Sequence, residues 1–146
     1  MSSDPVAHLP HTGPARFVTR ALETSAEHAV VEVRVPAGSA YRSARKGGAA
    51  GERVPAFLCI EFGAQAAAVL VGARAQLTER PPPGMLVSVR DAEFARAFLD
   101  ADATYRVTVE ARQAAAPLLI FAFEVADGAG NEVARGELTL HVELPS

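Results

Sequence analysis

A glutamate and a glutamine, Glu61 and Gln65, lie four residues apart in an otherwise apolar, alanine-rich run. Residues at positions i and i+4 of a helix share one face, so both side chains could point into one cleft. A carboxylate with apolar neighbours suits general acid or base chemistry, because burial favours its neutral form. A polar surface stripe, or a glutamate satisfied by a buried hydrogen bond, fits the same spacing, so spacing alone leaves the role of Glu61 open.

The residues before Glu61 predict where the helix begins and what it offers there. Pro55 suits the first helical position, where its missing N–H costs nothing. The free backbone N–H groups of Ala56, Phe57 and Leu58 are then expected at the helix start, ready to bind a carbonyl oxygen or an anion. Every helix has such an end, and this one is of interest only because a carboxylate follows on the same helix.

The four histidines are further candidates for acid–base chemistry. His8 and His11 flank a Leu-Pro pair near the N-terminus, whereas His28 falls in a predicted turn and His141 in a predicted strand. The latter two are expected to be solvated or structural. A general base must lie within hydrogen-bond reach of its substrate, and the spacing brings neither His8 nor His11 to a site.

A basic cluster of Arg42, Arg45, Lys46 and Arg53 lies in or beside a long segment rich in glycine and alanine. These side chains could contact an acidic carrier protein or the phosphate of a phosphopantetheine arm. A solvated loop fits the same residues at least as well. Cys59 has no partner in the sequence and is expected to be a core residue.

Composition limits the classes of protein that the chain can belong to. At 146 residues and 15.3 kDa it has the size of one ordinary domain, so we expect a single domain over residues 1–146. Its formal net charge of −3 argues against binding of nucleic acid or of an anionic membrane surface. One cysteine excludes an intrachain disulfide, and no cysteine–histidine cluster has zinc spacing, so no metal or cofactor is expected.

Two segments bear on cellular location. Residues 1–10 have neither the basic region nor the apolar core of a signal peptide. The apolar run 54–73 is about long enough to span a bilayer, but it carries Glu61 and Gln65 near its middle. We therefore expect a cytoplasmic protein in which this run is a buried helix and no segment crosses a membrane.

Side-chain periodicity predicts the elements that position these residues. Strands are expected over 15–23, 29–35, 85–98, 104–112, 118–126 and 132–143, and a long loop over 37–53. One long apolar helix should run from Pro55 to an end within 78–84, where three consecutive prolines lie. This order is an α+β plan, the hotdog fold, in which an antiparallel sheet wraps around one long central helix. Such sheets pair edge to edge between subunits, so a homodimer or a hetero-oligomer is expected.

Two motifs resemble those of the hotdog-fold 3-hydroxyacyl-acyl-carrier-protein dehydratases. Residues 10–14, PHTGP, followed by VTRALE over 18–23, are similar to the family's opening P-H-R-x-P-F-L-L-V-D-R-V-L-E. Residues 54–65, VPAFLCIEFGAQ, resemble M-P-G-V-L-x-x-E-A-M-A-Q at the start of its central helix. A subgroup associated with aryl-polyene-type pigment lipids is more similar still, because it has the L-P-H opening, a V/L-P-A-x-x-x-x-E-x-x-A-Q helix and no H-F-P-G loop.

The resemblance implies roles for individual residues. Glu61 would be the acidic catalytic residue and Gln65 would match the family's glutamine at the substrate site. Ala56 would stand where the family has a glycine whose N–H holds the thioester carbonyl, and Phe57 follows it at the same site. The family's catalytic histidine would fall on Gly47.

The histidine is where this sequence departs from the family. Residues 41–53 contain none. His11, the second catalytic candidate, matches an N-terminal family position other than that of the catalytic histidine. Chains of the subgroup are thought to pair with a second hotdog chain, which would supply the missing side chain.

The leading hypothesis is a 3-hydroxyacyl-ACP dehydratase-like subunit that acts on acyl-ACP or acyl-CoA thioesters in fatty-acid or polyene biosynthesis. Its catalytic histidine would come from a partner chain. One alternative is a non-catalytic scaffold that binds an acyl chain or a carrier protein. Another is a hotdog thioesterase, in which Glu61 activates water or attacks the carbonyl. Whether the chain is itself an enzyme, which acyl length it takes, and whether it assembles with itself or another chain stay open at this point.

Overall fold

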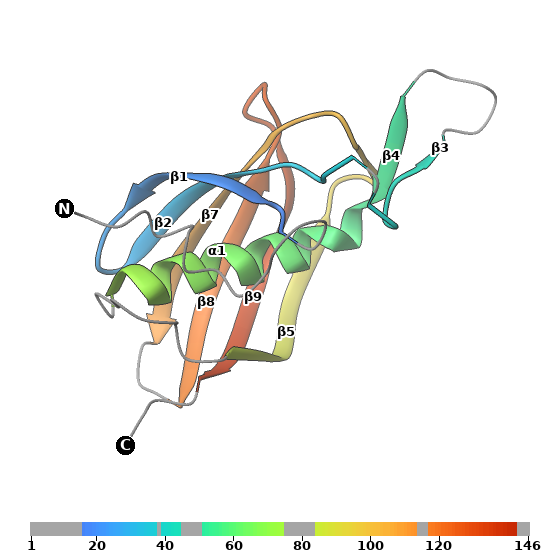
Figure 1. Ribbon diagram of the computed structural model, residues 1–146. Helices are drawn as coiled ribbons and strands as arrows, with labels where there is room; N and C mark the ends of the chain where they lie inside the picture. Colours follow the sequence, from blue (N-terminus) through green and yellow to red (C-terminus); the bar gives the residue numbers. More distant parts are fainter. Residues whose placement is uncertain (1–15, 38, 45–50, 75–83, 114–116, 143–146) are drawn as a thin grey trace.

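One long helix lies against an antiparallel sheet in the computed structural model (Figure 1). The structure describes residues 16–37, 39–44, 51–74, 84–113 and 117–142. The main sheet has six strands in the order β1-β2-β7-β8-β9-β5, and every neighbouring pair is antiparallel. The strands are β1 (Val18–Thr24), β2 (His28–Val33), β5 (Gly84–Phe94), β7 (Tyr105–Gln113), β8 (Leu118–Ala126) and β9 (Glu132–Val142). This confirms the predicted α+β plan of a sheet packed around a single helix.

A second, three-stranded sheet lies beside the start of the helix. It has the order β3-β4-β6, formed by β3 (Ser43–Ala44), β4 (Glu52–Pro55) and β6 (Phe98–Asp100). The prediction of an unstructured loop over 37–53 was therefore wrong in part, because two short strands lie there. The strand predicted over 85–98 is also two strands in different sheets, since β5 ends at Phe94 and β6 begins at Phe98.

The helix begins with a tight turn. A 3-10 turn, η4 (Ala56–Leu58), follows Pro55, and the α-helix α1 (Cys59–Arg74) continues from it. Proline fits here because its fixed φ suits a helix start and it has no N–H to satisfy. Pro55 itself has extended backbone and ends β4, so the helix begins one residue later than predicted. The predicted end of the helix lies outside the described residues.

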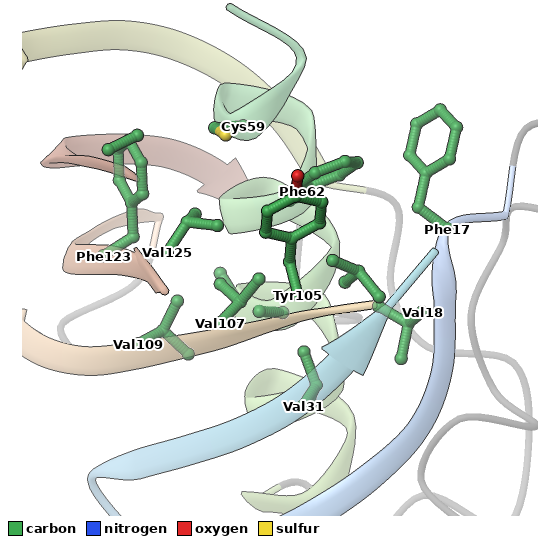
Figure 2. Close-up of a cluster of buried hydrophobic side chains, with 14 of the residues drawn as sticks. Phe17, Val18, Val31, Cys59, Phe62, Tyr105, Val107, Val109, Phe123 and Val125 are labelled. Atoms are coloured by element: carbon green, nitrogen blue, oxygen red, sulfur yellow. The ribbon is translucent and has the colours of Figure 1, made fainter. Parts of the chain in front are cut away.

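The core fills the space between α1 and the inner face of the sheet (Figure 2). The side chains of β2 and β7 are buried at alternate positions, as the valine spacing predicts. The helix is buried on most of its faces, with Phe62, Ala66 and Leu70 fully covered. At Gly63 it approaches the sheet so closely that a Cβ would lie 2.9 Å from Cγ of Phe123. These contacts fix how far and at what rotation α1 sits on the sheet.

Candidate active site

Glu61 and Gln65 share one face of α1, as the four-residue spacing requires. Gln65 is fully buried, and its Nε2 donates a hydrogen bond to Oε1 of Glu61 at 3.4 Å. The Oε1 of Gln65 accepts hydrogen bonds from the backbone N–H of Phe17 at 2.9 Å and of Val18 at 3.4 Å. The amide thus joins the carboxylate to the segment that enters β1. Glu61, in the first turn of α1, is only half-buried and remains partly open to solvent.

Phe17, whose backbone N–H bonds to the amide, belongs to a cluster of aromatic rings. The ring of buried Phe17 meets Phe62 edge-on, with centroids 5.4 Å apart, and the partly exposed Tyr41 in the same way at 6.2 Å. Phe17 also donates its backbone N–H to Gln65, whose amide contacts Glu61, so the amide links the carboxylate to this aromatic cluster. Sequence analysis did not single out Phe17 or Tyr41, because the contact between Phe17 and Gln65 spans 48 residues.

The helix start offers fewer N–H groups than the sequence predicts. The backbone N–H of Ala56 donates to the carbonyl of Ala97 at 2.9 Å, which anchors the helix start to the segment before β6. A substrate carbonyl could use this N–H only by displacing Ala97. The next residue, Phe57, carries a side chain that is 59% exposed.

The histidines divide into two groups. His8 and His11 lie outside the described residues. His28 contacts Glu23 at 3.1 Å and Ser25 at 2.9 Å within its own hairpin, and His141 is half-buried in β9 opposite Leu118. In the described part of the chain, no three His, Cys, Asp or Glu side chains come together as a metal site would require.

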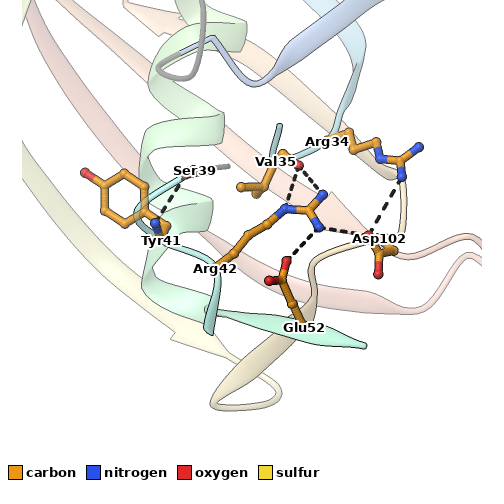
Figure 3. A network of polar contacts seen from close by, with 7 residues as sticks. All are labelled: Arg34, Val35, Ser39, Tyr41, Arg42, Glu52 and Asp102. Atoms are coloured by element: carbon orange, nitrogen blue, oxygen red, sulfur yellow. Dashed lines mark hydrogen bonds and ion pairs between the residues drawn. The ribbon is translucent and has the colours of Figure 1, made fainter. Parts of the chain in front are cut away.

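Arg42 is a structural residue (Figure 3). Its side chain is 6% exposed, and Nε and Nη2 both donate to the carbonyl of Val35, at 3.2 and 2.6 Å. Nη1 donates to Glu52 at 3.1 Å and to Asp102 at 2.8 Å. The hydrogen bond with Asp102 raises the pKa of Arg42 and lowers that of the Asp102 carboxyl. The solvated cluster proposed from sequence is therefore wrong for Arg42, whose charge is already paired.

The other members of the basic cluster and the cysteine have different environments. Arg45 and Lys46 lie outside the described residues. The guanidinium of Arg53 lies over the ring of Phe98, 3.8 Å from its centroid. Cys59 is fully buried in the core as expected, and burial raises the pKa of its thiol to about 12. A thiol in that state is inert as a nucleophile.

Among the described residues, no helix combines the length and the apolar character that a membrane span requires. This agrees with the expectation that the apolar run 54–73 is a buried helix, since most of α1 is covered by the sheet.

Solved structures of the same fold include a dehydratase and a thioesterase. The chain is similar to one in the ApeI:P dehydratase heterocomplex of Xenorhabdus doucetiae, with a TM-score of 0.81 and 18% identity over 99% of this chain and 93% of that chain. It is similar to AziG of S. sahachiroi, with a TM-score of 0.59 and 19% identity over 99% and 100% of the two chains. It is also similar to a hypothetical thioesterase of Streptococcus pneumoniae, solved with coenzyme A, with a TM-score of 0.58 and 14% identity over 85% of this chain and 84% of that chain.

These likenesses confirm the hotdog fold. No curated protein matches the sequence. The ApeP-like family, described as ApeP dehydratase, matches residues 4–143, which is nearly the whole chain. The predicted resemblance to a dehydratase subgroup of the aryl-polyene type is thereby confirmed, and the chain belongs to the ApeP-like dehydratase family.

Proposed function

We propose that this chain is the acid-bearing subunit of a 3-hydroxyacyl-thioester dehydratase, with Glu61 as its catalytic residue. The observation that carries the proposal is the hydrogen bond from Gln65 to Glu61, which orients a half-buried carboxylate. A preorganised carboxyl group at an opening can exchange a proton with a bound substrate. Membership of a dehydratase family supports this chemistry over hydrolysis.

The proposed reaction removes water across the α and β carbons of the acyl chain. A base takes the α-proton, and the electron pair of that C–H bond forms the double bond as the C–O bond to the β-hydroxyl breaks. Glu61, acting as the acid, gives a proton to the departing hydroxyl, so the products are water and an enoyl thioester. An N–H at the helix start would polarise the thioester carbonyl, and Phe57 is the better candidate because that of Ala56 bonds to Ala97.

The base would come from a second hotdog chain. Residues 41–53 contain no histidine, so a second copy of this chain would not supply one from that segment. The position of His11 is undescribed, and it stays a candidate for the same role. The chain that resembles ours in Xenorhabdus doucetiae is part of a heterocomplex, which supports a heteromeric assembly here.

Strand β5 is the proposed contact with that partner. It lies at one edge of the main sheet and pairs on one side with β9. Three of its apolar side chains, those of Leu86, Val87 and Val89, are more than a third exposed. An edge strand with open backbone groups and exposed apolar side chains favours pairing with another sheet.

The substitution Glu61→Gln in the assembled protein tests the catalytic role. It keeps the shape and removes the proton, so dehydration should slow by about 10²–10⁴-fold while the fold is retained. Glu124→Gln, on the exposed side of β8, is the matched control and should leave the rate unchanged. Full activity in Glu61→Gln would show that the carboxylate has no catalytic role.

Product analysis separates dehydration from the two alternatives. A 3-hydroxyacyl thioester of a carrier protein or of coenzyme A should give an enoyl thioester and no free thiol. Release of free thiol would identify a thioesterase. Binding of the thioester without turnover in the assembled protein would identify a scaffold subunit.

A further inference from the structure

Arg53 lies on β4, the strand that leads into the helix carrying Glu61. Its neighbour Val54 is fully buried, so Arg53 and Pro55 lie on the opposite, outer face of the small sheet. On that face β6 presents Phe98, which is the register partner of Pro55 and is 41% exposed. With its Cζ 3.8 Å from the ring centroid, Arg53 is held over an exposed aromatic surface.

The guanidinium group of Arg53 has no carboxylate partner among the described residues. Its Nε is buried and makes no hydrogen bond to them. The strand register places Asp100 opposite Arg53, yet the guanidinium lies over Phe98 and forms no ion pair with that carboxylate. By contrast, Arg42 and Arg96 each pair with an aspartate, at 2.8 and 2.9 Å. An arginine that is stacked but not neutralised keeps its N–H donors for an anion.

We propose that Arg53, stacked on Phe98, binds the phosphate of the pantetheine arm that carries the acyl substrate. This inference rests on the proposed function, because that function supplies a thioester as the ligand. The planar fork of arginine matches phosphate with two parallel hydrogen bonds. The ring of Phe98 fixes the guanidinium beforehand, so little side-chain freedom is lost on binding.

Arg53 and Glu61 lie on different elements, β4 and α1, as the separate ends of such a ligand require. The phosphate and the thioester lie at opposite ends of the pantetheine arm, so the phosphate must bind away from the reacting carbons. Arg53 precedes the helix start on the outer face of β4, whereas Glu61 lies further along, on α1. The arm would therefore pass the helix start at Phe57 on its way to the carboxylate.

Calorimetric titration with phosphopantetheine and with pantetheine tests the contact without catalysis. The full-length protein should bind phosphopantetheine about tenfold or more tightly than it binds pantetheine, as expected for hydrogen bonds to a charged group. Arg53→Gln should abolish this preference, and Arg53→Lys should weaken it while retaining the charge. Arg112→Gln, on β7, removes a charge of the same sign and should preserve it. Equal binding of both ligands by the wild type, or an unchanged preference in a folded Arg53→Gln variant, would overturn the proposal.

Two further measurements are needed. The first distinguishes a phosphate contact from a contact with the carrier protein, and the second distinguishes failure of this inference from failure of the proposed function. If Arg53 contacts the phosphate, Arg53→Gln should weaken the binding of coenzyme A and the binding of a phosphopantetheine-bearing carrier protein to the same extent. If only the binding of the carrier protein is weakened, Arg53 contacts the surface of that protein, which would contradict the phosphate contact. Dehydration of a 3-hydroxyacyl pantetheine by the protein assembled with its partner needs no phosphate contact, so it reports on the chemistry at Glu61. Its failure alongside an intact phosphate preference would refute the dehydratase function and leave Arg53 as a phosphate site.

Discussion

Gln65 ties the candidate site to the fold. Its amide is fully buried and is used at both ends, since Oε1 accepts from the backbone of Phe17 and Nε2 donates to Glu61. Each of these groups would be a buried or half-buried polar atom with one hydrogen bond fewer if the amide were absent. The orientation of the carboxylate therefore depends on the packing of the segment that enters β1.

The substitution Gln65→Leu removes both contacts at similar volume. It leaves the N–H of Phe17 buried without this acceptor, so the free energy of unfolding should fall by about 1–3 kcal/mol. Dehydration should also slow, because Glu61 loses the donor that orients it. Urea unfolding followed by circular dichroism measures the first effect. The control Gln113→Leu, at the exposed end of β7, should change neither the stability nor the rate. An unchanged free energy of unfolding in Gln65→Leu would mean that the amide does not anchor β1.

Among the elements, those with a clear side-chain pattern could be predicted from the sequence. Strands β2 and β7 alternate between buried and less buried positions, and α1 is long, apolar and preceded by proline. The short strands β3, β4 and β6 have two to four residues each, too few for a period to emerge. The pattern of these segments therefore predicts only a loop and the end of a longer strand.

The site shows the same division between local and distant contacts. The shared face of Glu61 and Gln65 follows from helix geometry alone. The partners of Arg42 lie 10 and 60 residues away, at Glu52 and Asp102, and no spacing rule brings them together. The paired state of this arginine could be learned only from the tertiary structure.

The seating of α1 on the sheet depends on Gly63. In Gly63→Ala the added Cβ would lie 2.9 Å from Cγ of Phe123 and 3.1 Å from Cδ1 of Leu138. The Cγ of Phe123 is close to its own backbone and both side chains are buried, so neither atom can move away easily. Overpacking costs about 1–3 kcal/mol, and alanine returns about 1 kcal/mol of helix propensity, so the net effect should be destabilising. Gly72→Ala is the matched control, since nothing lies within 4 Å of its Cβ and the variant should be more stable. Thermal unfolding of both variants decides the matter, and a Gly63→Ala protein as stable as Gly72→Ala would contradict the close approach.

At the scale of the whole molecule, the two edges of the main sheet differ in chemistry. The edge strand β1 carries Arg20 and Glu23, which pair with Glu32 and His28 on the neighbouring strand. Ion pairs of this kind help to keep an edge from joining another sheet. The other edge, β5, exposes mainly apolar side chains along its first half. The asymmetry predicts that assembly uses β5 and leaves β1 in solvent.

The substitution Val87→Lys tests this assignment, because Val87 is 49% exposed on β5 and contributes little to the core of the chain itself. A lysine there should prevent assembly, because its charged ammonium group would lose its hydration in the interface, while the chain stays folded. Leu22→Lys places the same charge on the opposite edge strand, at a side chain that is 37% exposed, and should leave the assembly intact. Native mass spectrometry of the protein purified with its partner gives the stoichiometry of each variant. Dissociation by Leu22→Lys and not by Val87→Lys would place the interface on β1, and the histidine proposed to act with Glu61 would then have to enter from that side.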